Sequence, residues 1–72
     1  MNKNNEIWRV SSDWLMAYTE DKRTTQKIQR SYPDFIPFAD YSKNGEIVGI
    51  QYKVPSARKR SAIHLLGVNV SK

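Results

Sequence analysis

The dipeptide Asn44-Gly45 separates two segments rich in β-forming residues, 35–41 and 46–54. Asn-Gly favours the tight turn that joins two antiparallel strands, so the sequence predicts a β-hairpin here. Pro37 has no N–H to donate to a ladder, which puts its strand at the edge of the sheet or at a bulge. Alternation along the second strand assigns one set of side chains to the core: Val48, Ile50, Tyr52 and Val54.

A helix is expected directly after this hairpin. Pro55 suits the first turn of a helix, and Gly67 suits its end, so the helix should extend to about Leu66. Arg60 and His64 lie on its polar side, and we expect His64 to be a surface residue.

The N-terminal half allows two interpretations, which differ at Ser11-Ser12-Asp13. If this tripeptide is a turn, residues 7–10 and 14–19 form a second hairpin, and Thr19 caps a helix that ends near Tyr32. If it is instead a helix cap, one long helix runs from about 13 to 32. We favour the turn, because polar residues would interrupt the apolar stripe of the long helix.

The fold predicted from these elements is a small α+β domain over residues 1–72, with residues 1–5 frayed. Two β-hairpins form an antiparallel sheet, and two helices cover one face of it, in the order ββαββα. A chain of 72 residues has room for one domain. With no Cys and a single His, it can build neither a disulfide nor a Cys/His zinc site, so we expect no metal and no cofactor. Stability must come from the core or from self-association.

The composition also indicates where in the cell the protein acts and which class of partner it binds. The absence of Cys and of an apolar leader at the N-terminus favours the cytoplasm, and the longest apolar run, residues 14–18, is too short for a membrane span. Twelve Lys and Arg against seven Asp and Glu give a net charge of +5. Such a charge attracts nucleic acid or an acidic protein.

Eight of the twelve basic residues fall into two groups. The first group lies on the expected N-terminal helix: Lys22, Arg23, Lys27 and Arg30. The second lies where the last strand meets the last helix: Lys53, Arg58, Lys59 and Arg60. Positive charge at a helix start opposes the helix dipole, and no Asp or Glu occurs between residues 48 and 72 to offset it. We therefore expect both groups to bind phosphate, with 58–60 as the anchor.

Five aromatic residues are numerous for so small a core: Trp8, Trp14, Tyr18, Tyr41 and Tyr52. Aromatic side chains on strands, next to Lys or Arg, stack on the bases of single-stranded nucleic acid. Large aromatics also supply buried area in a small domain, and we favour that role for most of them.

One pattern points to catalysis. Asp40 precedes the predicted turn, and Gln51-Tyr52-Lys53 follows it, in the string ADYSKNGEIVGIQYK. This resembles the core of PD-(D/E)xK nucleases, especially the Mrr-type restriction endonucleases, where an Asp begins one strand and Gln-x-Lys ends the next. The resemblance implies Mg²⁺-dependent cleavage, with Asp40 as metal ligand, Gln51 as its partner across the hairpin and Lys53 as catalytic lysine. The three side chains would have to meet on one side of the hairpin.

These observations favour a small basic nucleic-acid-binding accessory protein, for DNA or RNA, with no catalytic activity of its own. An interaction module or inhibitor that acts as a homodimer, or docks on an acidic protein, is the first alternative. A nuclease-like core is the second.

Overall fold

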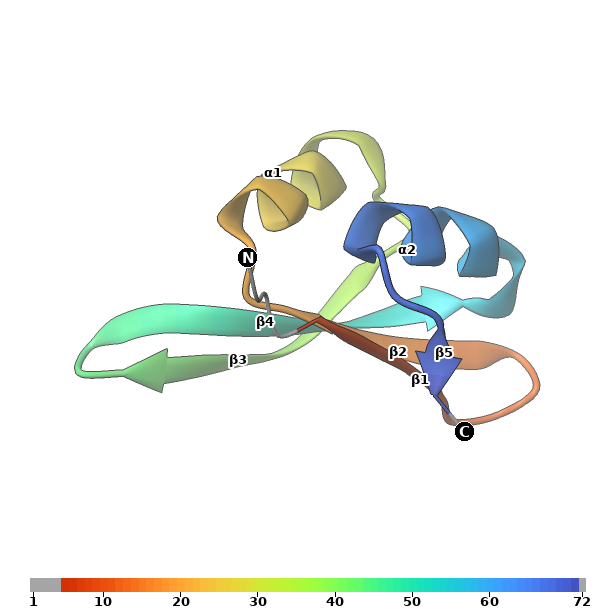
Figure 1. Ribbon diagram of the computed structural model, residues 1–72, viewed down its shortest axis with the longest axis horizontal. Helices are drawn as coiled ribbons and strands as arrows, with labels where there is room; N and C mark the ends of the chain where they lie inside the picture. The colour runs from red at the N-terminus through yellow and green to blue at the C-terminus, as the bar shows by residue number, and fades with distance from the viewer. Residues whose placement is uncertain (1–4, 72) are drawn as a thin grey trace.

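The computed structural model describes residues 5–71 and confirms the hairpin at Asn44-Gly45 (Figure 1). Both turn residues have positive φ, 54° at Asn44 and 82° at Gly45, as this tight turn requires. They join β3 (Ile36–Lys43) to β4 (Glu46–Pro55). β3 is an edge strand, and a register shift follows Pro37, as expected of a residue that cannot donate to the ladder.

The tripeptide Ser11-Ser12-Asp13 is a turn. It joins β1 (Glu6–Arg9) to β2 (Trp14–Thr19), and the Ser11 hydroxyl accepts hydrogen bonds from the backbone N–H of Asp13 and Trp14. The alternative of one long helix from 13 to 32 is therefore wrong. β2 pairs with β1 on one side and β4 on the other, which satisfies its backbone groups along both edges.

The five strands form one sheet in the order β3-β4-β2-β1-β5. The last strand, β5 (Val70–Ser71), was not predicted, because two residues carry no readable alternation. It pairs parallel to β1, so the sheet is mixed and not wholly antiparallel. Gly67, at φ 71°, ends the preceding helix and turns the chain towards this edge.

Two helices cover one face of the sheet, as expected (Figure 1). α1 (Lys22–Ser31) begins after Asp21, whose carboxylate accepts from the Arg23 N–H at 3.1 Å. The predicted cap, Thr19, is instead the buried last residue of β2. α2 (Lys59–Leu66) starts later than expected, because β4 includes Pro55 and a 3₁₀ turn, η1 (Ser56–Arg58), comes between them.

The core lies between the helices and the sheet and consists of Ile7, Leu15, Ala17, Ile28, Phe35, Tyr52, Val54, Ala62 and Leu66. Of the four β4 residues assigned to it, Tyr52 and Val54 are buried and Ile50 packs against it, but Val48 is 40% exposed. The reason is visible in Figure 1, where the tip of the β3–β4 hairpin extends beyond both helices. Val48 therefore lies beside the start of α1, at the side of a small hollow, and not in the core.

Neither helix of the described chain lies over the other side of the sheet, which we call the open sheet face. Alternation along the strands places these side chains on it: Trp8, Trp14, Met16, Tyr18, Ile36, Tyr41, Gln51 and Lys53. Their register partners confirm the face, since Trp8 pairs with Met16 and Met16 with Lys53. Met16 is buried there by its neighbours' side chains, without a second layer.

Asn5, the first described residue, joins three elements. Its side chain accepts from the Thr19 hydroxyl at 2.8 Å and donates to the Leu66 carbonyl at 3.0 Å. The rest of the segment expected to be frayed, residues 1–4, lies outside the described residues. Within residues 5–71, neither helix has the length and apolar character that a membrane span needs.

Removing the α1 cap tests the local basis of that helix. The Asp21 carboxylate serves both the Arg23 N–H and the Thr24 hydroxyl, so Asp21→Ala should lower the free energy of unfolding by about 1 kcal/mol. Urea denaturation followed by circular dichroism measures this. Asp13→Ala, an exposed acid in the β1–β2 turn, is the matched control, and an equal loss in both variants would contradict the assignment.

Gly49 allows a close packing on the open sheet face. The Tyr18 ring lies over it so closely that a Cβ on Gly49 would approach the ring carbon Cζ to 2.6 Å. Tyr18 is held there by a 2.7 Å hydrogen bond to Glu20 and an edge-on contact with Tyr41, the ring centroids 5.4 Å apart. The Glu20 hydrogen bond, with burial, raises the pKa of Tyr18 to about 12. The ring therefore cannot move aside without losing these contacts.

Gly49→Ala should accordingly destabilise the protein by about 1–3 kcal/mol, the usual penalty for overpacking. In a Tyr18→Ala background the same substitution should cost almost nothing, because the ring that it meets is gone. Denaturation of the four proteins of this cycle measures the coupling. Equal penalties in both backgrounds would show that Gly49 is needed for another reason.

Candidate nucleic-acid interface

The exposed side of α1 is basic. Thr24 and Ile28, four residues apart, are buried against the rest of the molecule, which turns the remaining positions outwards. The exposed cations are those predicted from the sequence: Lys22, Arg23, Lys27 and Arg30. The helix itself contains no Asp or Glu.

α2 adds to this surface. Ala62 and Leu66 are buried, whereas Lys59, Arg60 and His64 are exposed. This helix also contains no Asp or Glu. We call the outer surface of α1 and α2 the helix layer, and its six Lys and Arg residues are Lys22, Arg23, Lys27, Arg30, Lys59 and Arg60.

A groove of about 260 Å³ marks the place where the two helices meet. Arg23 and Lys27 line it from α1, and His64 lines it from α2. Arg60 lies one turn before His64 and so shares its side of the helix. From the sequence we expected His64 to be a surface residue with no further role, although its spacing from Arg60 placed the two on one side of the helix.

Arg58 differs from its neighbours in having a partner. Its Nε donates to the Asp34 carboxylate at 2.9 Å, from the segment between α1 and β3. Both side chains are nearly half exposed, so the ion pair adds at most about 1 kcal/mol to stability. Asp34 nevertheless compensates the positive charge of Arg58, which has no acidic residue near it in the sequence. Arg58 is therefore a poorer anchor for an anion than we expected.

Lys53 does not join the basic residues of α2, contrary to prediction. It alternates with the buried Tyr52 and Val54 and therefore lies on the open sheet face, away from the helices. There its Nζ stands 4.4 Å from the centre of the Trp14 ring, a cation–π contact.

The three residues of the nuclease resemblance are also separated. Asp40 pairs with Ile50 and lines a hollow beside α1, whereas Gln51 and Lys53 point to the open sheet face. Gln51 is occupied by the Tyr41 hydroxyl, which donates to it at 2.8 Å. The bulge after Pro37 sets this register, and a shift of one residue moves a side chain to the other face. Within residues 5–71, no three His, Cys, Asp or Glu side chains are grouped as metal ligands would be.

The aromatic residues divide between the two sides of the sheet. Tyr52 is 1% exposed and belongs to the core, whereas four of them lie on the open sheet face: Trp8, Trp14, Tyr18 and Tyr41. Among residues 5–71, the cation near the centre of this face is Lys53. Aromatic and basic side chains are therefore concentrated on opposite sides of the molecule.

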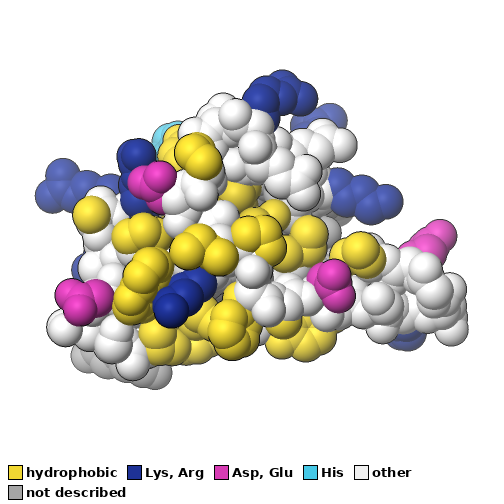
Figure 2. All heavy atoms as spheres, turned by 180° about the vertical axis from the view of Figure 1, so that it is seen from behind, with side chains coloured by type: hydrophobic (Ala, Val, Ile, Leu, Met, Phe, Trp, Pro, Cys, Tyr) yellow, Lys and Arg dark blue, Asp and Glu magenta, His cyan; other side chains and the backbone are white. Residues whose placement is uncertain are grey.

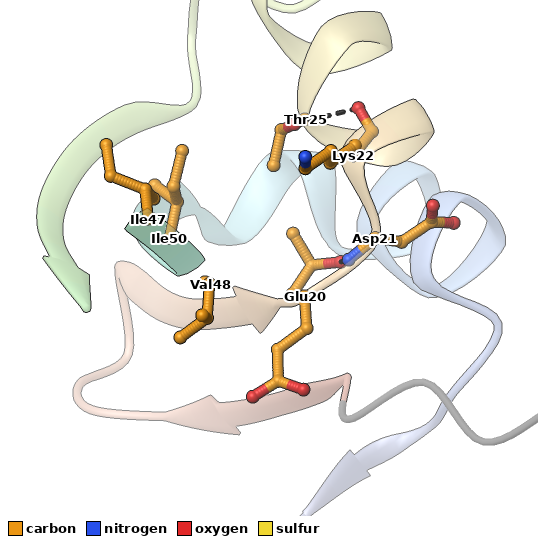
Figure 3. A pocket seen from close by; sticks show the side chains of 9 residues that line it. Glu20, Asp21, Lys22, Thr25, Ile47, Val48 and Ile50 are labelled. Atoms are coloured by element: carbon orange, nitrogen blue, oxygen red, sulfur yellow. Dashed lines mark hydrogen bonds between the residues drawn. The ribbon is translucent and has the colours of Figure 1, made fainter. Parts of the chain in front are cut away.

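A small hollow between the start of α1 and β4 is shown in Figure 3. Ile47 and Ile50 bound it on one side, and Lys22 and Thr25 on the other. Its volume of about 40 Å³ holds a few water molecules at most, which is too little for an organic ligand.

Two larger hollows, of about 240 and 230 Å³, lie between α1 and β3 and share Gln29, Pro37 and Tyr52. Burial raises the pKa of the Tyr52 hydroxyl, and the nearby Gln29 side chain offsets part of this shift. No described residue makes a hydrogen bond to that hydroxyl. Asp40 is the charged residue in the lining of these hollows, so they suit an anion less well than the groove between the helices.

No protein-family model, no curated protein and no solved structure matches this chain. The function of the chain has to be inferred from the arrangement of its own side chains.

Proposed function

We propose that the protein is a small nucleic-acid-binding accessory protein, acting in the cytoplasm without catalytic activity of its own, and that the helix layer is its binding surface. The observation that carries this proposal is the charge of the two helices. They contribute six Lys and Arg residues and no Asp or Glu to one side of the molecule, and a groove lined by Arg23, Lys27 and His64 lies between them.

The chemistry of this surface fits phosphate better than bases. Its polar groups are mostly long, flexible cations, which neutralise a phosphate backbone and release its counterions. Base reading needs side chains held in fixed positions in a groove of the nucleic acid. The aromatic residues that could stack on bases lie on the opposite side of the sheet. We therefore propose binding with weak sequence preference and strong dependence on salt.

A salt titration tests this proposal directly. If about four of the six cations contact phosphates, the logarithm of the binding constant for duplex DNA should fall against the logarithm of salt concentration with a slope of about −3.6. Fluorescence anisotropy with labelled duplexes and single strands, of DNA and RNA, measures it. A flat dependence, or no binding at about 50 mM salt, would overturn the proposal.

Paired variants separate a specific surface from net charge. Arg23→Ala/Lys27→Ala removes two cations from the groove and should weaken binding about tenfold, reducing the slope by about 1.8. Lys43→Ala/Lys53→Ala removes the same charge from the β3–β4 hairpin and the open sheet face, and should have little effect. Equal losses would mean that the overall charge, and not the helix layer, attracts the nucleic acid.

Arg58 and Arg60 provide a second comparison, within one short segment. Arg60→Ala should reduce the affinity more than Arg58→Ala, because Arg58 is already held by Asp34 at 2.9 Å. The same anisotropy assay measures both. A larger loss in Arg58→Ala would restore it as the anchor that the sequence suggested.

A further inference from the structure

The open sheet face is the largest feature that the proposed function leaves unused. Its centre is formed by aromatic and aliphatic side chains, and both tryptophans of the protein lie on it. Figure 2 shows hydrophobic side chains gathered over the sheet with a Lys or Arg side chain among them, while further Lys and Arg side chains stand out from the helical part of the molecule. Contiguous apolar surface of this kind marks an interaction site.

We propose that the open sheet face binds the same face of a second copy of this chain, forming a two-layered homodimer. The distribution of charge favours a second copy over other occupants. Two chains of net charge +5 repel each other, and this contact is the one that holds their helix layers furthest apart, on opposite outer sides.

The charges on the face are compatible with a twofold contact. Glu6 on β1 and Lys53 on β4 have opposite signs and lie on either side of β2. In a twofold arrangement a residue i of one copy meets a residue j of the other, and j meets i. The Glu6 of each copy can thus face the Lys53 of the other, while the Glu20 carboxylate, which accepts from the Tyr18 hydroxyl, adds a second negative charge beside Tyr18.

The available area is sufficient. The strands contain 4, 6, 8, 10 and 2 residues. At about 3.3 Å per residue and about 4.8 Å between strands, they project about 480 Å². Two such faces project about 960 Å² before the relief of their side chains is added, which is close to the roughly 1,000 Å² that a specific interface needs.

Pairing through the sheet edge is less favourable than pairing through the face. The long edge strand, β3, carries Pro37, two register shifts and Lys43, all of which hinder the addition of another strand. Two aromatic side chains of the face, Tyr18 and Tyr41, are by contrast already held by hydrogen bonds. Tyr41 is held by Gln51 and by the Tyr18 ring, so little side-chain freedom remains to be lost on association.

A single-stranded nucleic acid is a less suitable occupant. It would stack on the aromatic rings, but it also needs several cations along its backbone. Of the described residues, Lys53 is the one cation at the centre of the face, and it already lies over the Trp14 ring.

Two lysine substitutions on the same strand form the test. Ile36 on the open sheet face is 48% exposed, and Phe38, which lines the hollow beside α1, is 62% exposed, so neither is needed for the core. Ile36→Lys should weaken the dimer at least about tenfold by placing like charges in the contact, whereas Phe38→Lys should leave it intact. Tyr41→Ala is a second face variant, and it should also weaken the dimer.

Sedimentation equilibrium measures the mass, and tryptophan emission reports on the face itself. Twice the chain mass of 8.4 kDa is expected for the wild type and Phe38→Lys at about 100 µM, with emission shifting to the blue as dimer forms. A wild-type mass of 8.4 kDa up to about 500 µM would overturn the proposal, as would equal dissociation of both lysine variants. So would a monomer that binds an oligothymidine strand through Tyr41, because the face would then be a base-stacking surface. These mass readings do not depend on nucleic-acid binding by the helix layer.

Discussion

The ladder between β2 and β4 is the constraint on which the rest of the structure depends. Six consecutive residue pairs, from Trp14–Pro55 to Thr19–Ile50, hold these two strands in continuous register at the centre of the sheet. Because side chains alternate along a strand, this register decides at once which residues lie under the helices. It puts Leu15 and Ala17 into the core and leaves Trp14 and Met16 on the open sheet face.

The ladder also explains why the basic side chains lie on the helix layer and the aromatic side chains lie on the open sheet face. The strands supply both sides of the sheet, but the helices cover only one, so the exposed cations of the helices lie opposite the half-buried and exposed aromatic side chains of the open sheet face. Lys53 illustrates the effect. It is only five residues from Arg58, yet it lies on the other side of the sheet because it alternates with Tyr52 and Val54.

Local signals in the sequence were enough for most of the fold. Asn44-Gly45 and Gly67 impose backbone conformations that few other residues adopt, and alternation identified both hairpins. The predictions that were wrong concern features that depend on contacts between distant parts of the chain. The Arg58–Asp34 pair joins residues 24 positions apart, and the faces of Asp40 and Gln51 depend on a bulge whose position the sequence does not reveal. β5 forms only because β1 offers an open edge to two residues.

The helix layer also contains like charges that repel one another. Arg23 and Lys27 are four residues apart on α1, a spacing at which like charges destabilise a helix by about 0.2–0.5 kcal/mol, and the helix contains no acid to offset them. Lys59 and Arg60 in the first turn of α2 oppose its dipole in the same direction. In a domain whose core is this small, such repulsion is a measurable part of the total stability. An anion bound between the helices would relieve it, which gives the free energy of binding a contribution that the folded protein alone lacks.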